Sequence, residues 1–262
     1  MQRERDQFTS LGAYRKTTID EAIRHGGRII PMRWVMIRKP DGSVRSRLVV
    51  QEVARGPCDF AFASTPSSLG PRIGAHIALA NNFEIVFFDI RTAFAHAPIP
   101  EEEGFLWVRP PPSEQPPEGN VVWQALHALP GFRKAPRWFQ LWFRDKAMSL
   151  GYRSLTADPQ IFYNDELNSL MIVHVDDVML VIEKGEIERV ANGLKDFVEL
   201  KPGILLEQSW EKYLGIEWRR PERGVIELRI PGHTYERLLD IYSMKKCNPL
   251  HTLMSTGATA GD

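Results

Sequence analysis

The chain has 262 residues, 43% of them hydrophobic, which is enough to form the core of one large domain or two small ones. Its net charge is zero, which counts mildly against nucleic-acid binding because phosphate-binding domains are usually basic overall. The N-terminal residues form no signal-peptide core, and no apolar run approaches the ~20 residues needed to span a bilayer. We therefore expect neither secretion nor membrane insertion.

The charge is unevenly distributed along the chain. Residues 1–60 contain twelve Arg and Lys but seven Asp and Glu, so this part is net positive and the remainder net negative by the same amount. A basic lobe beside an acidic one suits a protein that binds phosphates and divalent cations. Uneven solvated charge without a partner explains the pattern equally well. Cys58 and Cys247 are too few and too far apart for a zinc or redox motif, which favours a reducing intracellular compartment.

The first predicted element is a basic β-hairpin over residues 32–53, because β-rich runs flank the turn residues of "PDGS". A helix is predicted over residues 71–82. The apolar run 83–90, "FEIVFFDI", is typical of a buried strand and places Asp89 at its end. Five prolines in residues 109–119 then predict an extended, irregular loop.

The second half of the chain alternates predicted helices and strands. Residues 135–152 form a helix that starts near Pro136 and carries two apolar stripes, so it is buried on more than one side. A strand, a tight turn and a second strand follow. The remaining predictions, in chain order, are a helix over residues 185–200, strands over 212–218 and 224–230, and a helix over 234–244. This order predicts an α+β fold with a mainly antiparallel sheet.

The turn in the strand pair 167–184 contains two adjacent carboxylates, Asp176 and Asp177. Two ionised carboxylates ~4 Å apart repel by roughly 4 kcal/mol at an effective dielectric near 20. A bound divalent cation, a raised pKa or exposure at the tip of the turn would each offset this repulsion. Aspartate is common in turns, so exposure is the simplest of the three explanations.

Asp89 is a third carboxylate at the end of an equally apolar strand. If the two strands are neighbours in one sheet, Asp89 and Asp176 can bind a pair of magnesium ions ~4 Å apart, which activate a 3′-hydroxyl and stabilise leaving pyrophosphate. Successive side chains of a strand point to opposite faces. We therefore expect Asp89 and Asp176 as the main ligands and Asp177 as a supporting one.

Between residues 28 and 255 the chain resembles the reverse transcriptase domain of copia-type long-terminal-repeat retrotransposons. A single similar block is weak support, but their common order and spacing are specific. The blocks are "RWVMIRKPDGSVRSRLVVQ", "FFDIRTAFAHAPIPEEEGFLWVRPP", "LPGFRKAPRWF", "LGYRSLTADPQIFY", "VHVDDVMLV", "KYLGIEW" and "YERLLDIYSMKKCNP".

The resemblance implies a right-hand polymerase that extends a DNA primer on an RNA or DNA template with deoxynucleoside triphosphates. Two Mg²⁺ ions, or Mn²⁺ as a substitute, would be its cofactors. It further implies a single polymerase domain over residues 1–262. Its expected parts are fingers at about 1–85 and 105–150, a palm at 86–104 and 151–220, and the start of a thumb or connection at 221–262. The sequence contains no motif of a protease, integrase or RNase H domain.

The resemblance also assigns roles to single residues. Asp89, Asp176 and Asp177 would be the catalytic residues, and would bind the metals together with the backbone of Ile90. The residues expected at the nucleotide are Arg45, Arg47, Ile90, Arg91, Thr92, Phe94, Arg133 and Lys134. Those expected at the primer or template are His174, Val175, Tyr213, Leu214 and Gly215, with "KYLGIEW" as the strand pair that holds the primer end.

Several of these roles have structural alternatives. Phe94 would exclude a 2′-hydroxyl beneath the sugar, but it is otherwise an ordinary core phenylalanine. Arg45 and Arg47 would contact the β and γ phosphates, and we expect strand register to turn one of them inward and leave the other solvated. Without the resemblance, "GFRKAPR", which contains Arg133 and Lys134, is an ordinary basic loop before a helix.

The chain departs from the family pattern at three positions, none of them a metal ligand. His174 replaces the usual tyrosine before V-D-D, Pro130 a tyrosine and Lys134 a glutamine. An active polymerase remains the leading hypothesis, and these changes motivate an alternative function, a degenerate nucleic-acid-binding remnant of such an element. A divalent-metal phosphohydrolase using the same carboxylates is a third possibility. As a retrotransposon enzyme the chain would act inside the cell, in a cytoplasmic particle or in the nucleus.

Overall fold

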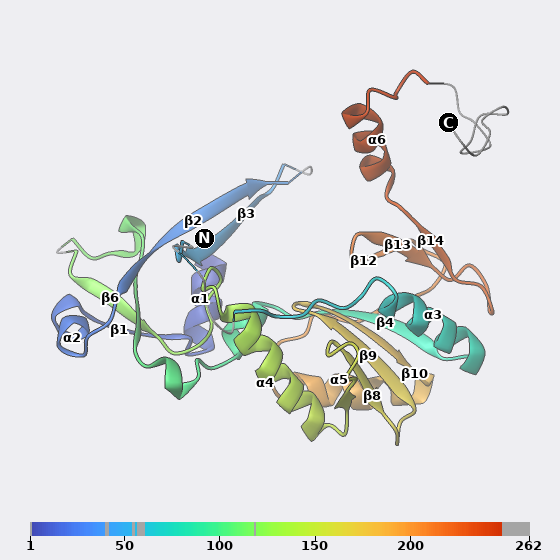
Figure 1. Cartoon of the computed structure of the whole chain (residues 1–262), viewed down its shortest axis with the longest axis horizontal. Helices are drawn as coiled ribbons and strands as arrows, with labels where there is room; N and C mark the ends of the chain where they lie inside the picture. Colours follow the sequence, from blue (N-terminus) through green and yellow to red (C-terminus); the bar gives the residue numbers. More distant parts are fainter. Residues whose placement is uncertain (1, 40–41, 54–55, 57–60, 118, 248–262) are drawn as a thin grey trace.

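Three β-sheets and their covering helices form the fold of this computed structural model (Figure 1). The structure describes residues 2–39, 42–53, 56, 61–117 and 119–247. Cys58, the tip of the predicted hairpin at 40–41 and the end of the last similar block at 248–249 lie outside these residues. Among the described strands every pairing is antiparallel except that of β2 with β5, which confirms the predicted mainly antiparallel α+β class.

The first sheet has the strand order β1-β6-β5-β2-β3. Its β2 and β3 strands form the predicted hairpin, whose buried side chains Met32, Leu48 and Val50 join the main core. The proline-rich segment between β5 and β6 contains one short 3₁₀ turn, η3, and no strand among its described residues. The strands are β1 (Tyr14–Thr18), β2 (Ile29–Arg38), β3 (Val44–Val50), β5 (Leu106–Arg109) and β6 (Val121–Ala125), and η3 is Pro112–Glu114.

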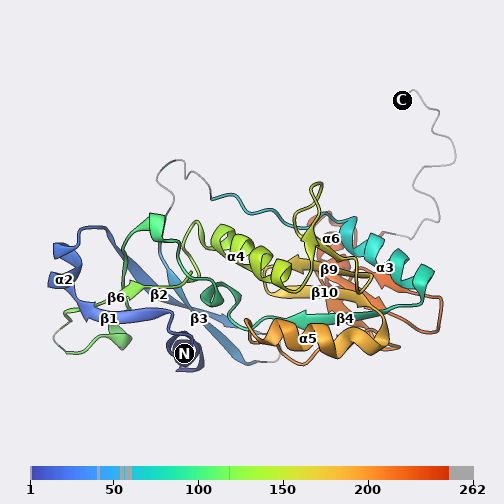
Figure 2. The same ribbon diagram turned by 90° about the horizontal axis from the view of Figure 1, so that it is seen from below.

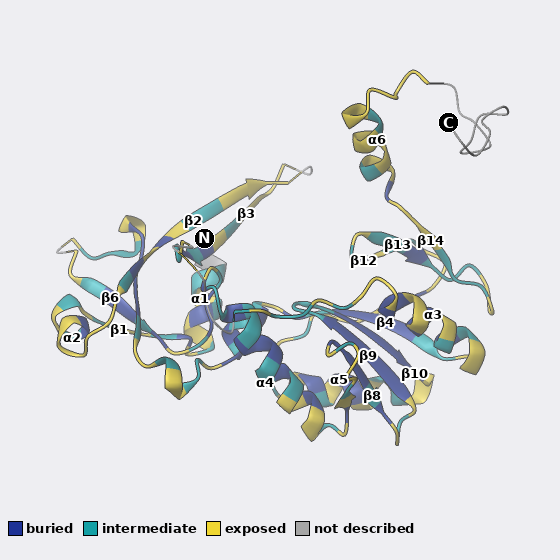
Figure 3. Ribbon diagram, in the orientation of Figure 1, coloured by how far each residue is buried: buried dark blue, intermediate teal, exposed yellow. Residues whose placement is uncertain are grey.

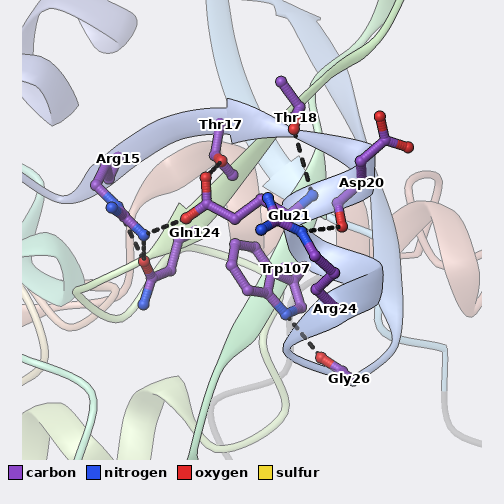
Figure 4. Close-up of polar contacts among 9 residues, drawn as sticks. All are labelled: Arg15, Thr17, Thr18, Asp20, Glu21, Arg24, Gly26, Trp107 and Gln124. Atoms are coloured by element: carbon purple, nitrogen blue, oxygen red, sulfur yellow. Dashed lines mark hydrogen bonds and ion pairs between the residues drawn. The ribbon is translucent and has the colours of Figure 1, made fainter.

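Two N-terminal helices, α1 (Gln2–Ser10) and α2 (Ile19–Arg24), pack beside this sheet. Thr18 is the N-cap of the α2 helix, and its hydroxyl accepts a hydrogen bond from the Glu21 N–H at 3.3 Å (Figure 4). The Glu21 carboxylate accepts hydrogen bonds from the Thr17 hydroxyl and from the Arg15 guanidinium, the latter at 2.9 Å. The Glu21 carboxylate therefore has hydrogen-bond donors from two different side chains.

The second sheet has the order β11-β4-β10-β9-β8-β7 and contains the predicted buried strands. Both of its faces are covered, which explains why β4, β9 and β10 are continuously apolar (Figures 2 and 3). Helices α4 and α5 cover one face, and α3 with the third sheet covers the other. The strands are β4 (Glu84–Asp89), β7 (Arg153–Ser154), β8 (Ile161–Asn164), β9 (Ser169–His174), β10 (Asp177–Ile182) and β11 (Ile204–Leu205).

The helices of this layer confirm three predictions. Helix α3 ends at Asn82, which adopts the left-handed conformation that stops a helix (φ 55°). Helix α4 has Pro136 in its first turn and buries Trp138 and Phe143 from the two predicted stripes. The elements are α3 (Gly70–Asn81), α4 (Ala135–Ser149) and α5 (Ile187–Lys195), with 3₁₀ turns η1 (Ala93–His96), η2 (Glu101–Glu103) and η4 (Lys184–Glu186).

The third sheet, β12-β13-β14, corrects one prediction. The pattern "KYLGIEW" predicted a single strand, but Leu214 (φ 47°) and Gly215 (φ 78°) form a two-residue turn that splits it into a hairpin. The strand pair implied by the family resemblance is thus confirmed. The predicted last strand and helix also form, and α6 extends away from the sheets (Figure 1). The elements are β12 (Glu211–Tyr213), β13 (Ile216–Arg219), β14 (Glu227–Arg229) and α6 (Gly232–Ile241).

No helix in the described part of the chain is both long and apolar enough to cross a membrane.

Candidate active site

The three aspartates meet at one end of the six-stranded sheet. Asp177, at the start of β10, lies directly opposite Asp89 on β4 and opposite His174 on β9. Opposite residues of an antiparallel pair share a face, so these three side chains project from the face covered by α3 and β12–β13. Asp176 occupies the turn beside Val175 (φ 56°), and its carbonyl accepts the Ile90 N–H at 2.7 Å.

This register makes Asp177 more central than the sequence indicated. Alternation along β10 was expected to point the Asp177 side chain away from the other two carboxylates. Asp177 instead lies directly opposite Asp89 in the antiparallel pair. Asp176 lies in the turn before the strand begins and so does not follow the alternation of the strand. The catalytic roles of all three remain predictions.

The carboxylates create a region of excess negative charge. Burial raises the pKa of Asp177, and the neighbouring charges of Asp176 and Asp89 raise it further. His174 and Lys201 act in the opposite direction but do not cancel the effect. Burial and the Asp177 charge also raise the pKa of Tyr213. Perturbed pKa values cluster at functional sites, which makes Asp177 a candidate functional residue.

Lys201 is a contact that sequence reasoning missed. Its ammonium Nζ lies 2.7 Å from the Asp89 Oδ1 atom, and its backbone N–H donates to the Asp89 carbonyl at 2.9 Å. Both side chains remain partly exposed, at 49% and 39%. The two residues are far apart in sequence, and no motif relates them, so only the fold could reveal the ion pair.

The donor set suits a hard divalent cation, but the side chains are not gathered around one. Within the described residues no three His, Cys, Asp or Glu side chains are arranged to hold a metal ion. Asp89 instead pairs with Lys201. Carboxylate oxygens are the ligands that Mg²⁺ prefers, and three carboxylates lie close enough here for Asp176 and Asp89 to raise the pKa of Asp177 beyond the effect of its burial. The residues therefore fit the metal chemically, provided that Asp89 exchanges Lys201 for the cation.

The polar groups of the segment after β4 form hydrogen bonds and an ion pair within the protein. The Arg91 N–H donates to the Glu199 carbonyl at 2.8 Å, and the Arg91 guanidinium pairs with the Glu199 carboxylate at 2.9 Å. Thr92 adopts a left-handed conformation (φ 53°), and its hydroxyl donates to the Gln7 amide oxygen of α1 at 2.9 Å. The Arg91 N–H is thus not free for a triphosphate. Phe94 is half-buried and packs edge-on against Phe139, at 6.0 Å.

The β2–β3 hairpin presents Arg45 and Arg47 on one face. Arg45 lies opposite Ile37 and Arg47 opposite Val35, and both are exposed. The expectation that register would turn only one of them inward is wrong, because residues two apart on a strand share a face. Beneath them, the Glu4 carboxylate of α1 accepts the Leu48 N–H at 3.2 Å. Burial raises the pKa of Glu4, while Arg47 and Arg45 oppose the rise.

The loop before α4 is pinned to the hairpin. The Pro130 carbonyl accepts the Val50 N–H at 2.7 Å, and a Cβ at Gly131 (φ 98°) would lie 2.0 Å from the Val50 carbonyl oxygen. Glycine is therefore required there. Arg133 donates to the Gly56 carbonyl at 2.9 Å, and the Lys134 ammonium donates to both Glu103 carboxylate oxygens at 2.8 and 2.9 Å. Both expected phosphate ligands thus have partners within the protein.

The expected primer residues divide into buried and accessible ones. Tyr213 stacks on Phe87 with ring centroids 4.9 Å apart, and its hydroxyl donates to the Ile172 carbonyl. Its side chain is buried and cannot reach a primer. Leu214 and Gly215 form the turn of the β12–β13 hairpin. Between this hairpin and the start of α3 lies a pocket of about 380 Å³, whose lining includes Arg72, His174, Tyr213, Leu214 and Trp218.

The class of protein follows from comparison with protein families. Residues 21–256 match the family described as "Reverse transcriptase (RNA-dependent DNA polymerase)". The match covers most of the chain, so the chain belongs to this family. This result confirms the resemblance found in the sequence.

Within this family, similar proteins come from plant retrotransposons of the copia type. The chain is 26% identical over 268 residues to the "Retrovirus-related Pol polyprotein from transposon TNT 1-94" of Nicotiana tabacum, a match that covers 96% of this chain and 19% of that protein. Two Arabidopsis thaliana proteins, the Pol polyproteins from transposons RE1 and RE2, are each 24% identical. These matches cover 75% and 87% of this chain, and 14% and 16% of the two proteins. The chain spans less than a fifth of the length of these relatives.

Proposed function

We propose that this chain is an RNA-directed DNA polymerase unit of a copia-like retrotransposon, which adds deoxynucleotides to the 3′ end of a primer. The observation that carries the proposal is the alignment of Asp89 and Asp177 at the ends of two neighbouring strands, with Asp176 in the adjoining turn. Family membership of residues 21–256 supports the reaction class.

The architecture is interpreted accordingly as a right hand. We assign the five-stranded sheet to fingers (about 1–85 and 105–150), the six-stranded sheet to a palm (86–104 and 151–220), and the region from 221 to a thumb or connection. The last part of that region, 248–262, lies outside the described residues. The exposed arginine face of β3 supports the first assignment, because guanidinium groups suit bidentate binding of phosphates.

The mechanism divides the work between the cofactor and the side chains. Two Mg²⁺ ions, or Mn²⁺ in their place, held by Asp89, Asp176 and Asp177, with the Ile90 backbone beside them, would supply Lewis-acid stabilisation of the transferring phosphoryl group. Lys201 neutralises Asp89 in this structure and must release it before that carboxylate binds a cation. The raised pKa of Asp177 means that added positive charge favours its ionised, ligating form.

The substrate would be held by groups around this end of the sheet. Arg45 and Arg47 would bind the phosphates of a deoxynucleoside triphosphate, and Phe94 would lie beneath its sugar. Leu214 and Gly215, at the β12–β13 turn, would support the primer end near His174. The partners are therefore an RNA or DNA template with its primer, and we expect the reaction inside the cell, in a cytoplasmic particle or in the nucleus.

Primer extension on a homopolymeric RNA template, with Mg²⁺ or Mn²⁺, tests the proposal. We expect the wild-type chain to extend the primer and Asp176→Asn to lose extension. Asp145→Asn is the matched control, because Asp145 is exposed on α4 and pairs with its neighbour Arg144. Wild-type extension no greater than that of Asp176→Asn would refute the activity.

A second candidate is a nucleic-acid-binding remnant without polymerase activity. It is favoured by the internal pairing of expected phosphate ligands, Arg91 with Glu199 and Lys134 with Glu103. This function predicts salt-dependent binding of a primer–template duplex without synthesis. Absence of binding to any duplex at low salt would exclude it.

A further inference from the structure

His96, at the end of η1, makes contacts that none of the assigned roles requires. Its ring atom Nε2 lies 2.9 Å from the Arg91 carbonyl oxygen and 3.4 Å from the Glu199 backbone nitrogen. One ring nitrogen therefore faces two backbone groups from segments more than 100 residues apart. The imidazole ring is half-buried and stacks on Trp142 of α4, with an angle of 14° between the ring planes and centroids 6.4 Å apart.

The two contacts require opposite forms of the ring. With a proton on Nε2, His96 donates to the Arg91 carbonyl but cannot accept from Glu199. With the proton on Nδ1 alone, Nε2 accepts the Glu199 N–H but offers nothing to the Arg91 carbonyl. The shorter contact favours the first form, and both forms are close in geometry. In this form His96 bonds to the Arg91 carbonyl, and the Arg91 N–H in turn donates to the Glu199 carbonyl.

These segments flank the Asp89–Lys201 ion pair. The Arg91 N–H donates to the Glu199 carbonyl at 2.8 Å, and the Lys201 N–H donates to the Asp89 carbonyl at 2.9 Å. Together they form a short antiparallel bridge, outside the named strands, that brings Lys201 beside Asp89. His96 covers the Arg91–Glu199 end of this bridge.

The groups around the ring are few and chemically distinct. Burial lowers the pKa of His96, whereas the hydrogen bond to the Arg91 carbonyl and the charge of Glu199 raise it. His127, from the segment after β6, lowers it further. Helix α4 presents the uncharged Trp142 ring. The ring is therefore held in place by packing against Trp142, and its Nε2 edge faces the backbone groups of Arg91 and Glu199.

We propose that His96 is a positioning residue: its Nε2–H holds the Arg91 carbonyl and so fixes the end of the strand carrying Asp89, to which the segment carrying Lys201 is bonded. Its effect on catalysis rests on the proposed polymerase function, but its effect on the backbone does not. Loss of this hold would let the Asp89 carboxylate shift from its reacting position, so the effect should fall on kcat more than on the KM for deoxynucleotide.

Amide hydrogen exchange, measured by NMR, tests the structural part. His96→Phe keeps a ring against Trp142 but removes Nε2, and we expect exchange of the Arg91 and Lys201 amides, which donate across the bridge, to rise roughly five- to tenfold. His96→Gln carries both a donor and an acceptor and should restore at least half of the protection. His76→Gln, on the exposed face of α3, is the control for loss of an imidazole. Unchanged exchange at both amides in His96→Phe would overturn the inference.

Primer extension tests the kinetic part. We expect kcat to fall roughly tenfold in His96→Phe, with KM within about twofold, and to recover in His96→Gln. Raised exchange with unchanged kcat would refute a positioning role in catalysis. If the wild-type chain shows no extension, the proposed function fails, while the exchange experiment still decides whether His96 fixes the segment.

Discussion

Two carboxylates of this chain lie in opposite environments. Glu21, beside the first sheet, has its pKa lowered, first by the hydrogen bond from the Thr17 hydroxyl and then by the Arg15 charge (Figure 4). Asp177, at the end of the six-stranded sheet, has its pKa raised by burial and by two neighbouring carboxylates. The fold supplies partners for Glu21 and places like charges together at Asp177. Perturbed pKa values cluster at functional sites, so this is the difference we expect between a structural carboxylate and the proposed metal ligand.

The largest expected effect comes from the same isosteric change at both positions. Asp177→Asn should reduce primer extension by roughly a thousandfold, since loss of a metal ligand costs several kcal/mol of transition-state stabilisation. It should also stabilise the fold at neutral pH, because it removes a repelled charge. Glu21→Gln should leave extension unchanged and destabilise the fold. Primer extension and urea unfolding of both variants check these outcomes, and equal activity of the two would remove the distinction.

The pH dependence of stability should have opposite signs at the two sites. The raised pKa of Asp177 means that its contribution to the free energy of unfolding is greatest below ~4 and is lost as pH rises through its folded-state pKa. The lowered pKa of Glu21 means that its contribution is present above ~4.3 and is lost as pH falls through its folded-state pKa. Urea unfolding of wild type, Asp177→Asn and Glu21→Gln from pH 3 to pH 8 measures both slopes. Slopes of the same sign would contradict this account.

Removal of Lys201 should have the smallest effect of these changes, and it tests whether a nearby positive charge controls cation binding by the carboxylates. Lys201→Met frees Asp89 from its ion pair and removes a charge that lowers the pKa of Asp177. Exposed ion pairs contribute ~0.2–1 kcal/mol, so we expect Mn²⁺ to bind about 1.4- to 5-fold more tightly. Lys195→Met, on the exposed side of α5, is the control. Weaker Mn²⁺ binding by Lys201→Met would show that Lys201 does not compete with the cation.

Much of the fold was predictable because its elements carry strong local signals. The apolar runs around Asp89 and Asp177 are strands buried on both faces, and the patterns of α3, α4 and α5 are helical, although α5 ends at Lys195 where the predicted helix continued to residue 200. The strand β1 escaped notice because it is polar and mostly exposed, and β11 because it has two residues. The turn at Leu214 was hidden, since a non-glycine residue with positive φ leaves no mark in an apolar pattern.

The site was predictable only in part. The three aspartates lie at strand ends, where a sequence pattern reveals them. The position of Asp177 directly opposite Asp89, however, depends on the register between β4 and β10. The Lys201 and His96 contacts join segments more than 100 residues apart, and local patterns do not encode such pairs. The prediction for Arg45 and Arg47 was wrong because it placed them on opposite faces of the strand. Residues two apart on a strand lie on the same face.

We propose that the carboxylates at the ends of β4 and β10 bind divalent cations. Mn²⁺ titration followed by water-proton relaxation measures this directly, without template or primer. We predict binding by the wild-type chain and by Glu21→Gln, and its loss in Asp177→Asn and Asp89→Asn. Equal Mn²⁺ binding by all four chains, or none by the wild type, would contradict the claim.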